Sequence, residues 1–142
     1  MKFRTIFFLI SVMTVTSCTK TKTQAVEGKL TGTIQVSKEL ESKLKKTDVL
    51  YIIARDQQIG PPSAVKRIAH PKFPLTFQIG PEDAMIPNAS GFEPGSKLTV
   101  SARISRTGNA IGAPGDLEGI FIKNPVVVGS ADVNITIDKV RN

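Results

Sequence analysis

Apolar and polar residues alternate with a period of two along much of the chain from Lys29 onward. The alternation is clearest in Lys29–Val36, Ser96–Ile104 and Ala131–Val140, where most alternate positions are apolar or small. Side chains of a β-strand point alternately to opposite faces of the sheet, so this period is typical of strands with one buried face. The pattern predicts three such strands, whose core faces consist of Leu30, Gly32, Ile34, Val36, Leu98, Val100, Ala102, Ile104, Val133, Ile135 and Ile137.

Shorter apolar segments predict the remaining strands. Asp48–Ala54 is apolar on both faces, which favours a central strand. Ala64–Ala69, Leu75–Ile79 and the run Val126–Val128 are further candidates. Prolines at positions 61, 62, 71 and 74 separate these segments, because proline cannot donate a hydrogen bond within an interior strand pair.

One segment has the spacing of a helix. Ser37 can cap a short helix that runs through Lys46, with Leu40 and Leu44 one turn apart. With about seven strands and this one short helix, residues 28–142 predict an all-β fold, namely an immunoglobulin-like antiparallel β-sandwich, in preference to a barrel. Antibody domains have a cysteine pair and a core tryptophan, which this sequence lacks, so the prediction depends on strand number and patterning.

The N-terminal residues have a different composition. Two positive charges in Met1–Arg4 precede a largely apolar run of 11 residues, Thr5–Val15, which is shorter than the roughly 20 residues that a membrane-spanning helix needs. The run leads into Val15-Thr16-Ser17-Cys18, which is similar to a bacterial lipobox. We therefore expect a lipoprotein signal peptide over residues 1–17, a lipidated Cys18 and a flexible tether over residues 18–27. The alternative is a plain signal peptide with Cys18 as an incidental thiol.

Export changes the kind of partner that the positive charge indicates. The sequence contains 19 basic and 12 acidic residues, and loss of residues 1–17 removes two of the basic ones, which leaves a net charge of +5. An exported basic chain meets anionic lipids, glycans and other proteins. We therefore expect no nucleic-acid partner. Thr19, rather than Asp, directly follows Cys18. By analogy with enteric lipoproteins, this favours the outer membrane, and we expect the protein in the bacterial cell envelope, at the periplasmic face of that membrane.

Residues suited to catalysis or metal binding are few. The single Cys and the single His exclude ordinary zinc and iron–sulfur sites, and the sequence contains no nucleophile elbow, phosphate loop or metalloprotease motif. A copper site would pair His70 with Met85, although a loop role for His70 is favoured. The acidic groups Glu82-Asp83, Asp116 with Glu118, and Asp132 could help to bind calcium, but they lack the spacing of a calcium loop, so solvated turn acids are favoured. We expect no enzymatic activity, no cofactor and no metal.

The segment Ser105–Lys123 is the main candidate for an interaction site. It contains four glycines and four apolar residues that we expect to be exposed, namely Ile111, Leu117, Ile120 and Phe121. Long loops in compact domains are usually functional or disordered. The segment is either a well-packed connection or a docking surface. In the second interpretation the centre consists of Leu117 and Phe121, and the charged rim consists of Arg103, Arg106 and Asp116.

Two arginines each follow an alanine at the end of an apolar strand. Arg55 and Arg103 can form structural ion pairs with Asp116 and Glu118, or they can bind the carboxylate or phosphate of a ligand. We favour the ion pairs.

Five segments occur in the same order and at similar spacing in one known family. They are Asp48–Arg55, Gly60–Arg67, Phe73–Leu75, Lys97–Ala110 and Pro114–Gly119. Over about Gly28–Val140 the chain resembles the C-terminal Ig-like domain of the CycH-type cytochrome c biogenesis protein, the apocytochrome-handling subunit of bacterial cytochrome c maturation. The resemblance implies an Ig-like fold, a context in cytochrome c maturation and no catalytic residues.

Members of that family usually carry transmembrane helices and tetratricopeptide repeats before this domain, and we expect this chain to be the terminal module alone. The expected function is that of a lipid-anchored periplasmic protein-interaction module accessory to cytochrome c maturation, with maturation components or apocytochrome as partners. The alternative is a general envelope lipoprotein with a structural or cell-surface role unrelated to haem proteins.

Overall fold

The computed structural model of the protein describes residues 27–56, 60–87 and 91–142. The predicted signal peptide, Cys18 and nearly all of the tether lie outside the described residues. Within the described ranges, no helix is long and apolar enough to cross a membrane.

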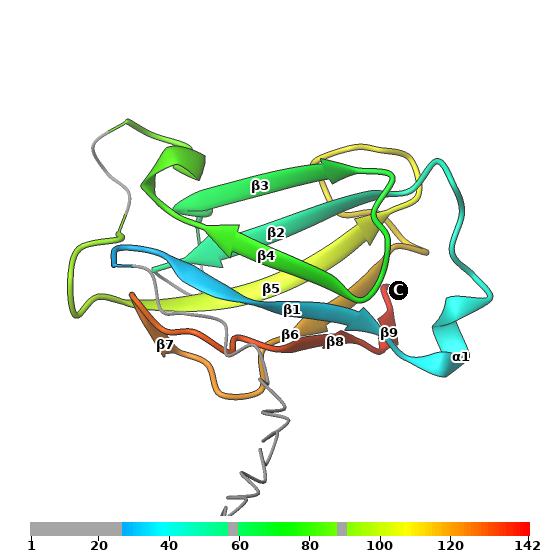
Figure 1. Ribbon diagram of the computed structural model, residues 1–142. Helices are drawn as coiled ribbons and strands as arrows, with labels where there is room; N and C mark the ends of the chain where they lie inside the picture. Colours follow the sequence, from blue (N-terminus) through cyan, green and yellow to red (C-terminus); the bar gives the residue numbers. More distant parts are fainter. Residues whose placement is uncertain (1–26, 57–59, 88–90) are drawn as a thin grey trace, which may run out of the picture.

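Two β-sheets pack face to face and form a sandwich (Figure 1). The small sheet has the strand order β4 (Leu75–Ile79), β1 (Leu30–Val36), β8 (Ile135–Ile137). The large sheet has the order β3 (Ala64–Ala69), β2 (Val49–Arg55), β5 (Lys97–Ser105), β6 (Leu117–Ile120), β9 (Lys139–Val140), and β7 (Val126–Val127) pairs with the first residues of β5. A short helix, α1 (Lys38–Glu41), follows β1, and a 3-10 turn, η1 (Pro81–Asp83), follows β4. The predicted all-β sandwich is confirmed.

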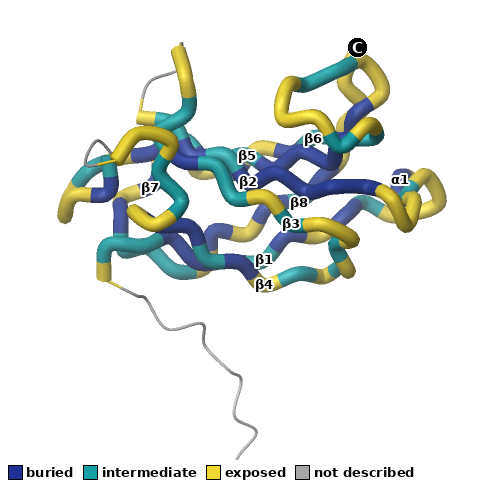
Figure 2. Tube along the Cα trace, turned by 90° about the horizontal axis from the view of Figure 1, so that it is seen from above, coloured by how far each residue is buried: buried dark blue, intermediate teal, exposed yellow. Residues whose placement is uncertain are grey.

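The core lies between the facing sides of the two sheets, where Figure 2 shows the buried segments concentrated. The predicted inward residues of β5 are fully buried. Val133 and Ile137 are also fully buried, and Ile135 is 1% exposed. The β2 strand lies between β3 and β5, as its apolar sequence predicts. Because burial of each large aliphatic side chain contributes about 1.5 to 3 kcal/mol, this aliphatic interior is the main source of stability.

One strand pair departs from the predicted antiparallel arrangement. The β1 and β8 strands run parallel, with Ile34 opposite Ile135 and Val36 opposite Ile137. A parallel pair needs a long connection, and here most of the domain lies between the two strands in sequence. Alternation gives the buried face of a strand but not its direction, which is why the sequence did not indicate this pair.

The predicted helix Ser37–Lys46 is wrong in length, since α1 ends at Glu41. The Ser37 side chain makes no capping hydrogen bond. After the helix, the Lys43 and Leu44 amides donate to carbonyls three residues earlier, and the Lys45 amide donates to the Asp48 carboxylate at 2.8 Å. These turn hydrogen bonds replace the helical ones.

The predicted strand Ala131–Val140 is divided between the two sheets. The β8 strand belongs to the small sheet and β9 to the large one, and the Asp138 amide between them donates to the Glu118 carbonyl at 3.2 Å. A single stretch of alternating sequence therefore crosses from one layer to the other.

The prediction of one long loop over Ser105–Lys123 is also wrong, because the segment contains β6. This strand pairs with β5 on one side and β9 on the other. A β-carbon at Gly119 would lie 2.2 Å from the Thr136 carbonyl oxygen, so only glycine fits where β6 passes β8. Four residues that include a glycine are too few to reveal a strand by their periodicity.

Candidate functional site

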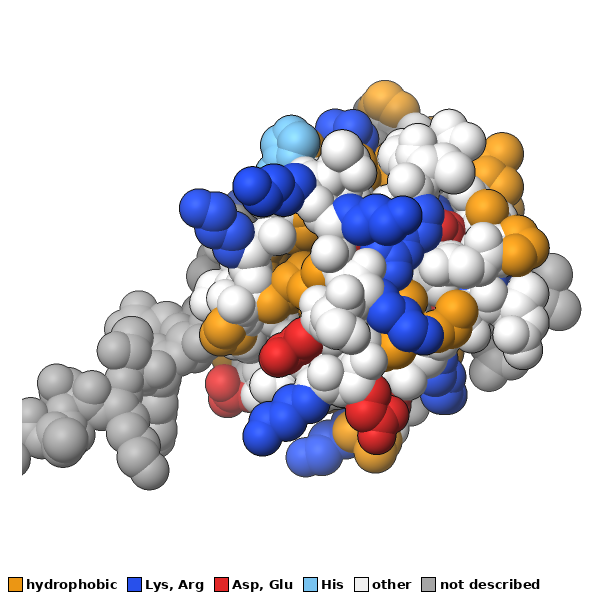
Figure 3. Space-filling model, turned by 90° about the vertical axis from the view of Figure 1, so that its right-hand side faces the viewer, with side chains coloured by type: hydrophobic (Ala, Val, Ile, Leu, Met, Phe, Trp, Pro, Cys, Tyr) orange, Lys and Arg blue, Asp and Glu red, His pale blue; other side chains and the backbone are white. Residues whose placement is uncertain are grey.

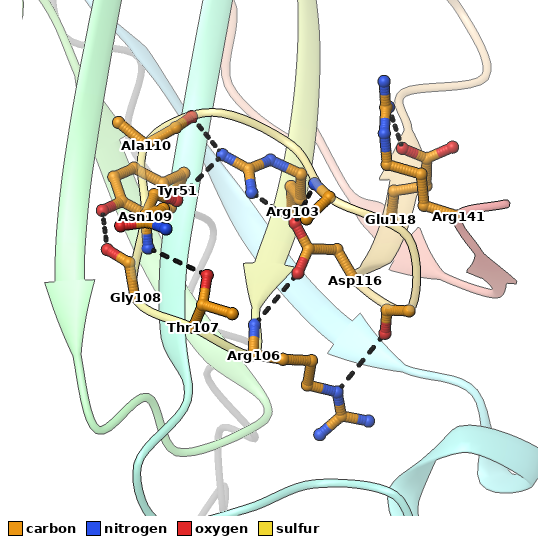
Figure 4. A network of polar contacts seen from close by, with 12 residues as sticks. Tyr51, Arg103, Arg106, Thr107, Gly108, Asn109, Ala110, Asp116, Glu118 and Arg141 are labelled. Carbon is orange, nitrogen blue, oxygen red and sulfur yellow. Dashed lines mark hydrogen bonds and ion pairs between the residues drawn. The ribbon is translucent and has the colours of Figure 1, made fainter.

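A loop over residues 106–116 covers part of the outer face of the large sheet, and Arg103 holds it there (Figure 4). Arg103 lies on β5 opposite Tyr51 of β2 and Glu118 of β6. Its Nη1 donates to Asp116 Oδ2 at 2.6 Å, and its Nη2 donates to the Ala110 carbonyl. The guanidinium carbon is 5.1 Å from the centre of the Tyr51 ring, which is cation–π distance. The loop therefore buries an arginine that strand alternation places on the outside.

Asp116 is the anionic centre of this network and is fully buried. Its carboxylate accepts hydrogen bonds from the backbone amides of Ala113 and Arg106, both at 3.0 Å, as well as from Arg103. Burial alone would raise the pKa of Asp116, but the hydrogen bonds from the two amides and the Arg103 guanidinium outweigh burial and lower the pKa below its ordinary value. The carboxylate is thus held in its charged form.

Further contacts fix the ends of the loop. Arg106 Nη1 is 3.0 Å from Asp48 Oδ2 and also donates to the Lys43 carbonyl in the turn after α1. The Tyr51 hydroxyl donates to the Gly108 carbonyl at 2.6 Å. Side chains of β2, β5 and the α1–β2 turn all hold it, so hydrogen bonds and ion pairs fix the loop although most of its residues are exposed.

The predicted ion pairs are confirmed for one arginine only. Arg103 pairs with Asp116, but Glu118 pairs with Arg141 at 3.0 Å. Arg55 donates to the Gly60 carbonyl at 2.5 Å and forms no ion pair within the described part of the chain. The predicted exposed rim is wrong for Arg103 and Asp116, which are 5% and 0% exposed, whereas Arg106 keeps partial exposure.

The predicted apolar centre is also corrected. Leu117 and Phe121 point into the sandwich and are buried in its core, because alternation along β6 turns these residues inward. The exposed members of the predicted set are Ile111 and Ile120, at 84% and 62% exposure. Of the predicted apolar set, only Ile111 and Ile120 are therefore available to a partner.

A groove of about 640 Å³ lies beside the loop on the outer face of the large sheet. Strand pairing places four of its residues in one row across the sheet: Val65, Ile53, Ser101 and Ile120. One wall consists of Ala110, Ile111, Gly112 and Arg141, and further lining residues include Arg55, Pro62, Met85 and Glu118. We take this groove as the candidate site.

Sequence reasoning missed most of the groove. The sequence pattern places Ile53 and Val65 on strands, and Ser101 on the polar face of another, but it does not show that these three residues are neighbours. The available signal was the outer half of the β2 alternation, which is apolar where an exposed sheet face is normally polar. That signal is weak until the pairing of the strands is known.

The described residues contain no cluster of three or more His, Cys, Asp or Glu side chains suited to a metal ion. His70 lies in a loop, as expected, with Nδ1 2.6 Å from the Lys46 carbonyl oxygen. Of the acidic turn residues, Glu82 pairs with Lys29 at 2.7 Å and Asp83 with Lys66 at 3.3 Å. The hydrogen bond from Lys29 lowers the pKa of Glu82. These acids form ion pairs at the surface of the fold.

Comparison with known proteins gives one match. The family model of the cytochrome c-type biogenesis protein H Ig-like domain matches residues 30–138, which covers both sheets as far as the end of β8 and confirms the resemblance noted in the sequence. No curated protein and no solved structure matches the chain significantly.

Proposed function

Because the chain belongs to the family of Ig-like domains of cytochrome c-type biogenesis protein H, we propose that it is a protein-interaction module accessory to cytochrome c maturation. The module has no enzymatic activity of its own and binds a maturation component or apocytochrome. Lipidation of Cys18 anchors it in the bacterial cell envelope, at the periplasmic face of the outer membrane.

The groove is the observation that supports an interaction role most directly. Its apolar residues Met85, Ile111 and Ile120 are exposed, and Ile53 and Val65 are half-buried, on a face that a hydrogen-bonded loop and four paired strands hold in place. Recognition surfaces commonly combine an apolar centre with a charged rim. Arg55 and Arg141 supply that rim beside Ile111, Ile120 and Met85.

The test is a deletion of the chromosomal gene, followed by measurement of covalent haem in c-type cytochromes by haem staining of envelope proteins. We expect the haem signal to fall in the deletion strain while apocytochrome synthesis continues, and to return when the wild-type gene is supplied. A normal haem signal together with a weakened cell envelope, measured as detergent sensitivity, would contradict the proposal and favour a general structural lipoprotein.

A further inference from the structure

We propose that the groove binds an extended segment of a partner protein in which an aliphatic residue stands two positions from an acidic residue. This inference rests on the proposed interaction role and adds the chemistry of the occupant.

The floor of the groove provides the place for the aliphatic side chain. Ser101 lies between Ile53 and Ile120 in the cross-strand row, and neighbours in such a row are about 5 Å apart. A small serine between two isoleucines leaves a hollow of side-chain width, to which Ile111 and Met85, 84% and 57% exposed, add apolar surface. The surface around the hollow is aliphatic, so it fits an aliphatic side chain better than a base or sugar ring, which aromatic platforms bind.

Two uncompensated cations on this face favour an acidic occupant, and one of them, Arg55, lines the groove. Arg55 on β2 and Arg67 on β3 belong to the outer face of the sheet, and neither forms an ion pair with another described residue. The other two arginines of this face already have carboxylate partners, Asp116 for Arg103 and Glu118 for Arg141. Figure 3 shows that lysine and arginine side chains also predominate over acidic ones at the end of the molecule where α1 and the C-terminus lie. The field at the groove therefore favours an acidic partner.

The position of Arg55 indicates an extended segment. Ser101 pairs with Ile53, and Arg55 follows Ile53 by two residues on β2, so the hollow and the Arg55 cation are one strand and two residue levels apart. At about 3.3 Å per residue, two levels are about 7 Å along the strands. Side chains at positions i and i+2 of an extended peptide share one face and span the same length. An aliphatic and an acidic residue two positions apart thus match the hollow and the cation, whereas Arg67, on the other side of β2 and outside the groove lining, adds positive charge to this face without fixing the spacing.

The experiment selects peptides from a random dodecapeptide library displayed on phage, with the purified domain as bait. Selected peptides are then measured by fluorescence polarisation against the wild type, Ser101→Phe, which fills the hollow, and Arg55→Glu, which reverses one cation. The matched control is Thr76→Phe, which adds the same aromatic ring to an exposed position of β4 on the opposite sheet. Thermal unfolding checks that each variant folds.

We expect enriched peptides with an acidic and an aliphatic residue two positions apart, a loss of affinity of roughly tenfold or more in Ser101→Phe and Arg55→Glu, and no change in Thr76→Phe. Failure to enrich any peptide, enrichment of basic or purely apolar peptides, or equal binding by Ser101→Phe would overturn the inference. Self-association of the wild type through this face, detected by sedimentation and abolished by Ser101→Phe, would also overturn it.

Haem staining separates this inference from the proposed function. If the deletion strain loses covalent haem but a chromosomal Ser101→Phe strain keeps it, the role in maturation stands and the groove is not the binding site. If neither strain loses haem while peptide binding follows the expected pattern, the groove binds an acidic segment outside cytochrome c maturation, and the proposed function fails.

Discussion

At the scale of single residues, the ion pair of Arg103 and Asp116 organises the face that carries the groove. Both groups are buried, and each has additional hydrogen bonds to the backbone. A buried pair contributes little compared with a well-packed apolar pair, but loss of one partner leaves an uncompensated charge. The pair therefore holds the loop in one defined position.

Replacement of Asp116 by Asn leaves the Arg103 guanidinium buried without its counter-ion. We expect the free energy of unfolding to fall by about 3 to 5 kcal/mol in urea denaturation. The matched control is Arg141→Gln, which breaks the exposed pair with Glu118 and should cost less than about 1 kcal/mol. Equal losses in the two variants would show that the buried pair does not hold the loop.

The lowered pKa of Asp116 predicts a pH dependence. Because the pKa of this carboxyl is below its ordinary value of 3.8 in the folded protein, the unfolded chain binds the proton first as the pH falls. The contribution of Asp116 is thus complete above about pH 4 to 5 and is lost as the pH falls through the folded pKa. We expect urea titrations between pH 5 and about pH 2 to show a smaller loss of stability in Asp116→Asn than in the wild type. The same loss in both would contradict this assignment.

At the scale of secondary-structure elements, the alternation of apolar and polar residues predicted the longer strands that have one buried face. The β3 and β4 strands have the predicted bounds, and β1, β2 and β5 differ from prediction by one residue at an end or both ends. The β6 strand, the division between β8 and β9 and the length of α1 were missed, because each depends on contacts with distant residues. The groove was missed for the same reason: its row of four residues comes from four strands, and only the pairing of those strands brings them together.

The register of β5 gives a direct test at this scale. Val100 is fully buried, whereas Thr99 is partly exposed on the outer face. Val100→Asp places an unpaired charge in the core and should cost roughly 3 to 5 kcal/mol, whereas Thr99→Asp should cost less than about 1 kcal/mol. Thermal unfolding of the two variants measures the difference. Similar shifts in melting temperature would mean that the inward face of β5 is wrongly assigned.

At the scale of the whole molecule, the first strand of the described chain and the groove belong to different layers of the sandwich. The described chain enters through β1 of the small sheet, and the groove lies on the outer face of the large sheet. The proposed anchor at Cys18 precedes β1 in the sequence, so it joins the sandwich through the small sheet. The proposed anchoring at a membrane surface would also raise the local concentration of the domain near other envelope proteins.

The anchor itself is tested by Cys18→Ser. Without the thiol no diacylglyceryl group can be attached, so we expect the variant to move from the membrane fraction to the soluble fraction and to lack the acyl mass of the wild type. Ser17→Ala is the matched control, because it keeps a small residue before the cysteine and should remain anchored. A wild type without an acyl mass, or a Cys18→Ser variant that stays with the membranes, would leave Cys18 as an incidental thiol.

Site-specific photocrosslinking in living cells tests the central claim most directly. A photoreactive benzoylphenylalanine replaces Ile120 on the groove floor or, as control, Thr76 on the opposite sheet, and the adducts are identified by mass spectrometry. We predict that Ile120 crosslinks to a cytochrome c maturation component or to apocytochrome and that Thr76 does not. Adducts at Ile120 with cell-wall or general envelope proteins alone, or the same adducts from both positions, would contradict an interaction module of cytochrome c maturation.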